Sequence, residues 1–175
     1  MRMFGLIVVT ALAVAGAALS AEPAKVETAR AELKDLAGKK VGEVLLEQTP
    51  NGVLVTADLK DAPAGTHAMH IHEVGKCEAP FKSAGGHFNP GTKEHGMKND
   101  KGMHAGDLPN VEVPASGAVK VQALVHGVTM GEGPTSLFDK DGSSIVLHAV
   151  ADDYKTNPAG NAGDRIACGV VEKAK

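Results

Sequence analysis

Hydrophobic residues alternate with polar ones along most of the chain, in short runs that are separated by turn residues. Two such runs, at 41–47 and 53–59, flank Pro50–Gly52, and this pattern is typical of a β-hairpin. The runs at 111–114 and 119–125 predict a second hairpin. Further strands are expected over three apolar segments, at 68–74, 144–150 and 166–171.

The segment 27–37 fits two structures. Its composition suits a helix, but Ala29, Ala31 and Leu33 alternate as they would in a strand. The short strands and the 21 glycines favour an all-β fold, an antiparallel sandwich or barrel. Two long segments, 75–110 and 151–164, match neither strand nor simple turn, and loops of this length are usually functional.

Composition narrows the class of protein. At 175 residues and 43% hydrophobic, the chain is expected to form one domain with a core of its own. Aromatic residues make up only 3% and Trp is absent, so the core is expected to consist of Val, Leu, Ile and Ala. The 18 basic residues do not exceed the 21 acidic ones, which argues against a nucleic-acid-binding protein.

Residues 1–21 have the pattern of a secretory signal peptide. Arg2 is followed by the apolar run 4–19 and then by small residues around Ser20 and Ala21. A membrane anchor is the alternative, but the run is short for a bilayer span. Cleavage would leave 22–175 as the mature domain, with 17 basic and 21 acidic residues, a net charge of −4. We expect this domain in the periplasm, without stable membrane association.

Cys77 and Cys168 are the only cysteines. In an exported protein such a pair is expected to form a disulfide. Two free thiols or a metal-binding pair are the alternatives.

The histidines suggest metal binding. His70 and His72 lie one residue apart on a predicted strand, so both imidazoles project from the same face. The pair alone is equally compatible with two surface histidines. His148 lies in an apolar strand, where a buried structural histidine would be the more common interpretation. We expect His67 to hold a loop by hydrogen bonds and His126 to lie at the surface.

The 75–110 loop adds a stronger pattern. Three histidines and one aspartate fall within a short glycine-containing stretch: His87, His95, His104 and Asp107. Three imidazoles and a carboxylate make a complete tetrahedral zinc set. The alternative is a solvated polar loop.

The types of candidate ligand also indicate whether copper could bind. A cluster made only of imidazoles suits copper or zinc, whereas a blue-copper site would need a cysteine thiolate. Met69, Met97 and Met103 lie near the histidines and could bind Cu(I), although packing is the more common role of methionine.

Several motifs, in order, resemble those of the copper/zinc superoxide dismutases. The likeness extends from about Ala29 to Val171. The matching segments are Gly65–Cys77, Gly85–Pro90, His95–Gly96, His104–Leu108, Val146–Asp153 and Gly160–Val170. The resemblance implies an eight-stranded antiparallel Greek-key β-barrel with long metal-binding loops.

The resemblance also implies residue roles. His70, His72, His87 and His148 would bind one copper ion, and His87, His95, His104 and Asp107 would bind one zinc ion. His87 would thus bridge the two metals as an imidazolate. Asp152 would link ligands of both metals, and Arg165 would attract the substrate. Cys77 and Cys168 would tie the loop to the barrel.

The activity implied is dismutation of superoxide to dioxygen and hydrogen peroxide through a Cu(II)/Cu(I) cycle. A copper chaperone or metal-buffering protein on the same fold is the alternative, but a carrier needs no arginine for a substrate. The segment between Cys77 and His87 is longer than in the common eukaryotic form. Lys155 is the only basic residue between His148 and Arg165, and the family's usual run of paired acidic and basic residues is not obvious there. Lys76, Lys82 and Lys155 are therefore candidates for steering superoxide. The resemblance is compatible with a homodimer without fixing the oligomeric state.

Overall fold

The computed structural model describes residues 27–174, so the predicted signal peptide and its cleavage site lie outside the described residues. These residues form short strands and one 3-10 helix. The elements are β1 (Thr28–Asp35), β2 (Lys40–Thr49), β3 (Gly52–Leu59), β4 (Gly65–His67), β5 (Met69–His72), η1 (Lys82–Ala84), β6 (Val111–Val113), β7 (Val119–Val125), β8 (Ser144–His148), β9 (Arg165–Val170) and β10 (Glu172–Lys173).

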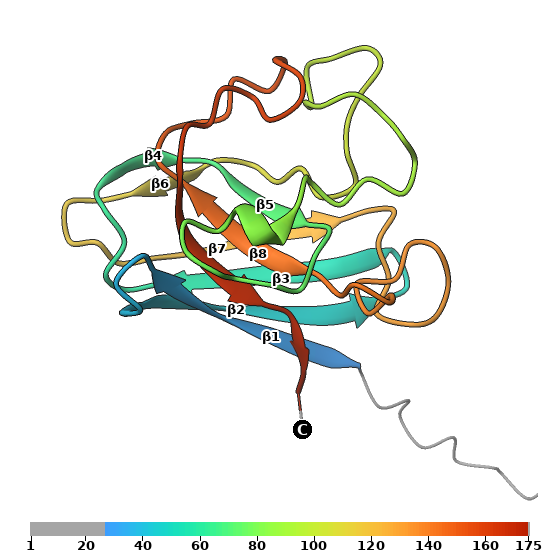
Figure 1. Cartoon of the computed structure of the whole chain (residues 1–175), viewed down its shortest axis with the longest axis horizontal. Coiled ribbons are helices and arrows are strands. Elements are labelled where there is room, and N and C mark those ends of the chain that lie inside the picture. Colours follow the sequence, from blue (N-terminus) through green and yellow to red (C-terminus); the bar gives the residue numbers. More distant parts are fainter. Residues whose placement is uncertain (1–26, 175) are drawn as a thin grey trace, which may run out of the picture.

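The strands build a curled antiparallel sheet (Figure 1). The main sheet has the order β5-β8-β9-β1-β2-β3-β7, with β10 beside β1, and β4 pairs with β6 in a small second sheet. The interruption between β4 and β5 is one residue long, and so is that between β9 and β10. Counted as one strand each, these pairs give the eight strands that the sequence predicts. The all-β fold class is confirmed.

The alternation of buried and exposed residues shows whether the segment 27–37 is a helix or a strand. Ala29, Ala31 and Leu33 are fully buried, and the residues between them are exposed, so 28–35 is a strand. The core is aliphatic, as the composition predicts. Its largest fully buried aliphatic side chains include Leu33, Leu46, Leu59, Ile71, Leu137, Ile145 and Leu147. In the described residues, no helix is long and apolar enough to cross a membrane.

One of the two predicted hairpins is wrong. The pair β2 and β3 forms a regular hairpin from Gly42↔Leu59 to Thr49↔Gly52. By contrast, β6 pairs with β4, and β7 pairs with β3, so these two consecutive strands do not pair with each other. The glycine at 117 marks a turn, but the chain uses it to pass from the small sheet to the main one. A turn motif in the sequence reports a change of direction and not the partner of the next strand.

Two adjacent strands, β5 and β8, present a second buried face outside the barrel. Met69 and Ile71 of β5 and Ile145 and Leu147 of β8 belong to the core. His70, His72 and His148 therefore point to the opposite face, because successive side chains alternate. They are nevertheless at most 3% exposed, because the 75–110 and 151–164 loops cover this face. Figure 1 shows both loops standing together above one end of the sheet.

The disulfide predicted from the sequence joins the start of the 75–110 loop to β9. Cys77 and Cys168 are bonded, with their Cα atoms 5.6 Å apart. Phe81, Ala84 and Val146 pack around Cys168. The loop segment after Cys77 is thereby held against β8 and β9.

Replacing Cys77 and Cys168 together by Ser should lower the melting temperature. The bond closes a loop with a sequence separation of 91. In the chain-entropy description such a crosslink stabilises the folded state by about 4–5 kcal/mol. A loss of that size corresponds to a fall of roughly 10–20 °C for a domain of this length. Calorimetry of the variant and of the chemically reduced parent protein tests this, and unchanged melting in both would contradict it.

Candidate metal centre

Six histidines and two aspartates meet beneath the loops, on the outer face of β5 and β8. They are His70, His72, His87, His95, His104, Asp107, His148 and Asp152, and each is at most 6% exposed. All but Asp152 fall into two sets of four whose candidate ligand atoms lie within 4.8 Å of one another. We call them the four-histidine cluster (His70, His72, His87, His148) and the His3Asp cluster (His87, His95, His104, Asp107).

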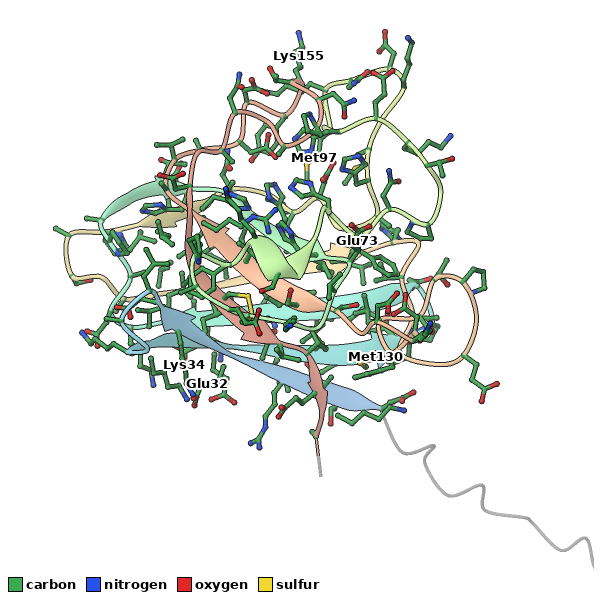
Figure 2. All side chains as sticks on the ribbon, in the orientation of Figure 1. Glu32, Lys34, Glu73, Met97, Met130 and Lys155 are labelled. Atoms are coloured by element: carbon green, nitrogen blue, oxygen red, sulfur yellow. A yellow bond between two sulfur atoms is a disulfide. The ribbon has the colours of Figure 1, made fainter. Side chains whose placement is uncertain are left out.

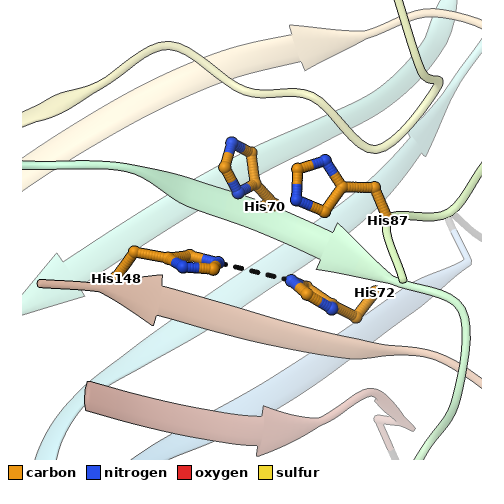
Figure 3. Close-up of side chains that lie close together, drawn as sticks. All are labelled: His70, His72, His87 and His148. Atoms are coloured by element: carbon orange, nitrogen blue, oxygen red, sulfur yellow. Dashed lines mark hydrogen bonds between the residues drawn. The ribbon is translucent and has the colours of Figure 1, made fainter. Parts of the chain in front are cut away.

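In the four-histidine cluster the imidazoles face one another (Figure 3). The Nε2 atoms of His72 and His148 lie 3.4 Å apart. Nδ1 of His70 and Nε2 of His87 are fully buried and have no hydrogen-bond partner. Buried polar atoms without a partner are rare in folded proteins. The inward-facing nitrogens of His70 and His87 are therefore suited to bind a metal ion.

The remaining nitrogens of this cluster point outward and are occupied. Nδ1 of His72 donates to the carbonyl oxygen of Gly85 at 3.1 Å, and Nε2 of His70 donates to Oδ2 of Asp152 at 2.9 Å. Nδ1 of His148 lies 3.4 Å from the carbonyl oxygen of Gly163. Such outer contacts fix the tautomer and leave the inner nitrogen's lone pair free for a metal.

Asp107 organises the His3Asp cluster. Its Oδ1 lies 2.8 Å from Nδ1 of His87, 3.0 Å from Nδ1 of His95 and 3.3 Å from Nδ1 of His104. Its Oδ2 accepts the backbone N–H groups of Gly96 and His104. Three imidazole nitrogens thus converge on one side of a carboxylate whose other oxygen is held by the backbone.

His87 belongs to both clusters. Its Nδ1 faces Asp107, and its Nε2 faces the four-histidine cluster. Its ring centroid is 3.9 Å from that of His70 and 5.3 Å from that of His104. One imidazole is therefore shared by the two clusters, an arrangement in which it could bridge two metals.

Asp152 connects the clusters from outside. Its Oδ2 accepts from Nε2 of His70, and its Oδ1 accepts from Nε2 of His95, both at 2.9 Å. Gly160 packs against this carboxylate at a φ of +64°, where an added Cβ would overlap Oδ1 of Asp152. Only glycine allows the loop to close over the aspartate at this point.

Two residues that the sequence did not single out hold Asp152. The side chain of Asn110 donates to the carbonyl oxygen of Asp152 and accepts its backbone N–H, both at 2.9 Å. The backbone N–H of Asn110 donates to the hydroxyl of Tyr154 at 2.7 Å. The sequence around Asn110 and Tyr154 does not indicate these roles, because the hydrogen bonds join positions more than 40 residues apart.

Arg165 lies across the strands from His148. The two are register partners in the β8–β9 pair, next to an irregularity in the register. Its guanidinium, half-buried, donates to the carbonyl oxygens of Phe81 at 2.7 Å and of Gly85 at 2.6 Å. Burial lowers the pKa of Arg165. Its charge also contributes to lowering the pKa values of His72 and His148, which shows how close it lies to the four-histidine cluster.

Burial keeps three of these imidazoles neutral in the metal-free protein, those of His72, His87 and His148. Burial, followed by the neighbouring His87 and Arg165, lowers the pKa of His72 to about 2. Burial and the neighbouring His70 lower the pKa of His148 to about 3. Burial also lowers the pKa of His87 to about 4, although its hydrogen bond with Asp107 opposes the shift.

His95 behaves in the opposite way. Burial alone would lower its pKa, but its hydrogen bonds with Asp107 and Asp152 outweigh this and raise the pKa to about 9. Burial raises the pKa values of Asp107 and Asp152, but their hydrogen bonds lower these values by more. The largest lowering contribution comes from His104 for Asp107 and from His70 for Asp152. Both pKa values end well below the usual range. The buried carboxylates are therefore ionised, and His95 carries their counter-charge when no metal does.

The other histidines and the predicted lysines lie outside the clusters. His67 is buried and lies within hydrogen-bond distance of the carbonyl oxygens of His148 and Pro63, which confirms its structural role. His126 is exposed, as expected. Lys76, Lys82 and Lys155 are exposed, and their part in steering superoxide stays a prediction.

The residues present fit the two metals that the sequence suggests. Two buried imidazole nitrogens lack partners, and both sets have the donor types that copper and zinc bind: four imidazoles in one, three imidazoles and a carboxylate in the other.

Comparison with known proteins gives a consistent result. Residues 40–171 match the family model described as copper/zinc superoxide dismutase. The chain is similar to superoxide dismutase [Cu-Zn] 1 of Aquifex aeolicus, at 49% identity over 81% of this chain and 86% of the relative. It is similar to superoxide dismutase [Cu-Zn] of Caulobacter vibrioides, at 44% identity over 83% of this chain and 86% of that one. A crystal structure of a double mutant of a SOD-like protein from Bacillus subtilis superposes with a TM-score of 0.78, at 42% identity, over 81% of this chain and 95% of that one.

The metal-free protein should lose stability as the pH falls below about 6.5. In this window the unfolded chain binds protons at three histidines that stay neutral in the folded chain (His72, His87 and His148). Their contribution is complete above pH 6.5 and is lost toward their lowered pKa values. His95 does not compensate, because below pH 6.5 it is protonated in both states; its stabilisation is lost only as the pH rises through about 9.

Denaturant unfolding of the metal-free protein between about pH 7 and pH 4.5 measures this dependence. The free energy of unfolding should fall by up to about 1.4 kcal/mol per pH unit for each histidine. His148→Gln should make the slope shallower, and His126→Gln, outside the cluster, should leave it as it is. A flat profile in the parent protein would show that the buried imidazoles do not resist protonation.

Proposed function

The chain belongs to the copper/zinc superoxide dismutase family, and on that premise we propose the residues by which it binds its metals and turns over superoxide. The enzyme is an oxidoreductase that uses copper and zinc. Of two superoxide anions, one is oxidised to dioxygen, and the other is reduced and takes up two protons to give hydrogen peroxide. We assign copper to the four-histidine cluster and zinc to the His3Asp cluster.

The observation that carries this assignment is the position of His87. Its Nδ1 lies 2.8 Å from Asp107, and its Nε2 is buried without a partner beside His70. An imidazole in this position can serve both metals only as a bridge. Bound copper would supply a one-electron redox couple, and bound zinc would supply fixed charge without redox chemistry of its own.

The protein residues then have separate tasks. His70, His72 and His148 would present copper with nitrogens whose rings are oriented by Asp152 and by the backbone carbonyls of Gly85 and Gly163. His87, anchored through Nδ1, has Nε2 as the nitrogen that can release and regain a proton on the copper side. This atom is well placed to deliver one of the two protons that peroxide formation needs.

Arg165 would attract and orient the anion. The mature domain has a net charge of −4, so the overall charge opposes encounter with superoxide. The Arg165 guanidinium is fixed by two carbonyl oxygens beside the four-histidine cluster. A positive charge held in place at the site is therefore needed to overcome the repulsion.

A copper chaperone or metal buffer is less well supported. A carrier must bind a metal and release it, and neither task needs a fixed arginine or an imidazole shared by two complete clusters. The arrangement of Arg165 and His87 favours the enzyme.

His148→Ala should abolish turnover and leave zinc binding largely intact. His148 belongs to the four-histidine cluster alone. Losing one ligand should lower the rate by at least about a hundredfold, since losing the partner of a ligand already has effects of this order. Superoxide consumption and elemental analysis measure the two effects, with His126→Ala as the control. Equal loss of zinc and copper in His148→Ala would refute the assignment.

Arg165→Glu should slow the reaction with superoxide more than Arg165→Ile, at unchanged metal content. Loss of the charge should lower the second-order rate roughly tenfold, and its reversal by roughly a further tenfold. Salt should slow the parent enzyme, because ions screen exposed charges beyond about 8–10 Å. Stopped-flow decay of superoxide over a salt series tests this. Equal rates for both variants, without salt dependence, would mean that Arg165 does not guide the anion.

Residues 1–21 are proposed to direct export to the periplasm, with 22–175 as the mature domain. The apolar run and the following small residues support this proposal. N-terminal sequencing of protein from the exported fraction tests it, and a mature chain that retains Arg2 would contradict it. The absence of membrane association after cleavage and a homodimeric state stay predictions.

A further inference from the structure

The four methionines of the described residues divide sharply by exposure. Met69 is 3% exposed and Met130 is 1% exposed, so both belong to the core. Met97 is 40% exposed and Met103 is 37% exposed, both within the 75–110 loop. Figure 2 labels one of each kind, Met97 in the loops above the sheet and the buried Met130 near one end of the sheet.

Met97 and Met103 lie on neighbouring stretches of backbone. Each follows a glycine, and these glycines touch: a Cβ on Gly102 would be 2.6 Å from the carbonyl oxygen of Gly96. The backbone N–H of Glu94 also donates to the carbonyl of Lys101, which brings the same two stretches together. The two methionines thus lie on adjacent stretches of the loop backbone.

Both methionines line one groove, which runs between the loop and β7 and has a volume of about 720 Å³. Its apolar wall includes Leu108 and Leu124, and it reaches the zinc-side residues His104 and Asp107. The two methionines therefore border the apolar space between the loop and the barrel. They are also adjacent in sequence to two proposed zinc ligands, since Met97 follows His95 by two residues and Met103 directly precedes His104.

We propose that Met97 and Met103 are a peroxide-reactive pair whose oxidation weakens the hold of the 75–110 loop on zinc. The proposal rests on the proposed function for the source of its oxidant, since hydrogen peroxide is the product of dismutation. In the reaction the thioether sulfur attacks one peroxide oxygen and the O–O bond breaks. A sulfoxide S–O bond forms, and the other oxygen leaves as water. The sulfur loses the two electrons that the peroxide gains.

The sulfoxide changes the contact that each side chain makes. Oxidation turns an apolar, flexible side chain into a polar one with a strong hydrogen-bond acceptor. In a groove walled by leucines this oxygen favours water over the apolar contact. Water drawn into the groove changes the packing of the loop segments that carry His95 and His104 beside β7, so zinc dissociates faster. Because sulfoxides can be reduced enzymatically, the change is reversible.

The test uses the full mature domain loaded with zinc and free of copper, so that peroxide cannot react at a copper ion. After exposure to hydrogen peroxide, peptide mass mapping should find one added oxygen on Met97 and on Met103, and none on Met69 or Met130. Zinc transfer to a chromogenic chelator should become roughly tenfold faster, the lower end of the effect of altering a metal ligand's surroundings. Treatment with methionine sulfoxide reductases should restore the original rate.

The variant Met97→Leu with Met103→Leu keeps apolar side chains of similar size, so it should fold and bind zinc normally. Its zinc release should not respond to peroxide, whereas Met130→Leu should respond like the parent protein. Equal oxidation of the buried methionines, an oxidised pair with unchanged zinc release, or the same acceleration in the double variant would each overturn the proposal. None of these readouts depends on superoxide turnover, so failure of the proposed function would be recognised separately in the activity measurement.

Discussion

Two buried carboxylates make the crowded histidine centre possible. Six imidazoles share one buried space, and burial lowers the pKa values of three of them, His72, His87 and His148. Asp107 and Asp152 stay ionised there because they accept hydrogen bonds from several imidazoles and backbone N–H groups at once. A buried carboxylate is tolerated only when its partners are nearly complete, and losing one leaves a charge without compensation. The carboxylates thereby hold four of the imidazoles, those of His70, His87, His95 and His104, while backbone carbonyls hold those of His72 and His148.

Neither carboxylate lies on a strand of the barrel, so the loops have to be placed accurately against the sheet. The backbone does much of this work. The backbone N–H of Ile71 in β5 donates to the carbonyl oxygen of Gly106, and the N–H of Phe88 donates to the carbonyl oxygen of Ile71. The 75–110 loop thereby extends the sheet beside β5. The 151–164 loop is held by Asn110, which pairs with the backbone of Asp152. Because these contacts join loops to strands, metal binding and the order of the loops are energetically coupled.

The parts of the site that follow local rules could be predicted from the sequence. The one-residue spacing of His70 and His72 places both on the same strand face, and the four candidate ligands of the 75–110 loop stand out by composition. His148 could not be distinguished from a core histidine by its neighbours, because β8 is buried on both faces, and only the motif resemblance identified it. Asn110 and Tyr154 were missed because their roles come from contacts across the fold. The predicted pairing of β6 with β7 failed for the same reason, since strand partners are chosen by the whole sheet and not by the turn.

One backbone atom links the orientation of the four-histidine cluster to the position of Arg165. The carbonyl oxygen of Gly85 accepts from Nδ1 of His72 and also from the guanidinium of Arg165. Gly85 has a φ of +74°, and a Cβ there would lie 2.8 Å from the side chain of Glu73, so the position requires glycine. The second acceptor of Arg165, the carbonyl of Phe81, belongs to the same segment, which the disulfide holds against β9. A shift of this segment would therefore rotate a proposed copper ligand and displace the arginine together. The disulfide thus does more than add stability, because it fixes the position of the Arg165 guanidinium, the proposed guide for superoxide, relative to His72, a proposed copper ligand.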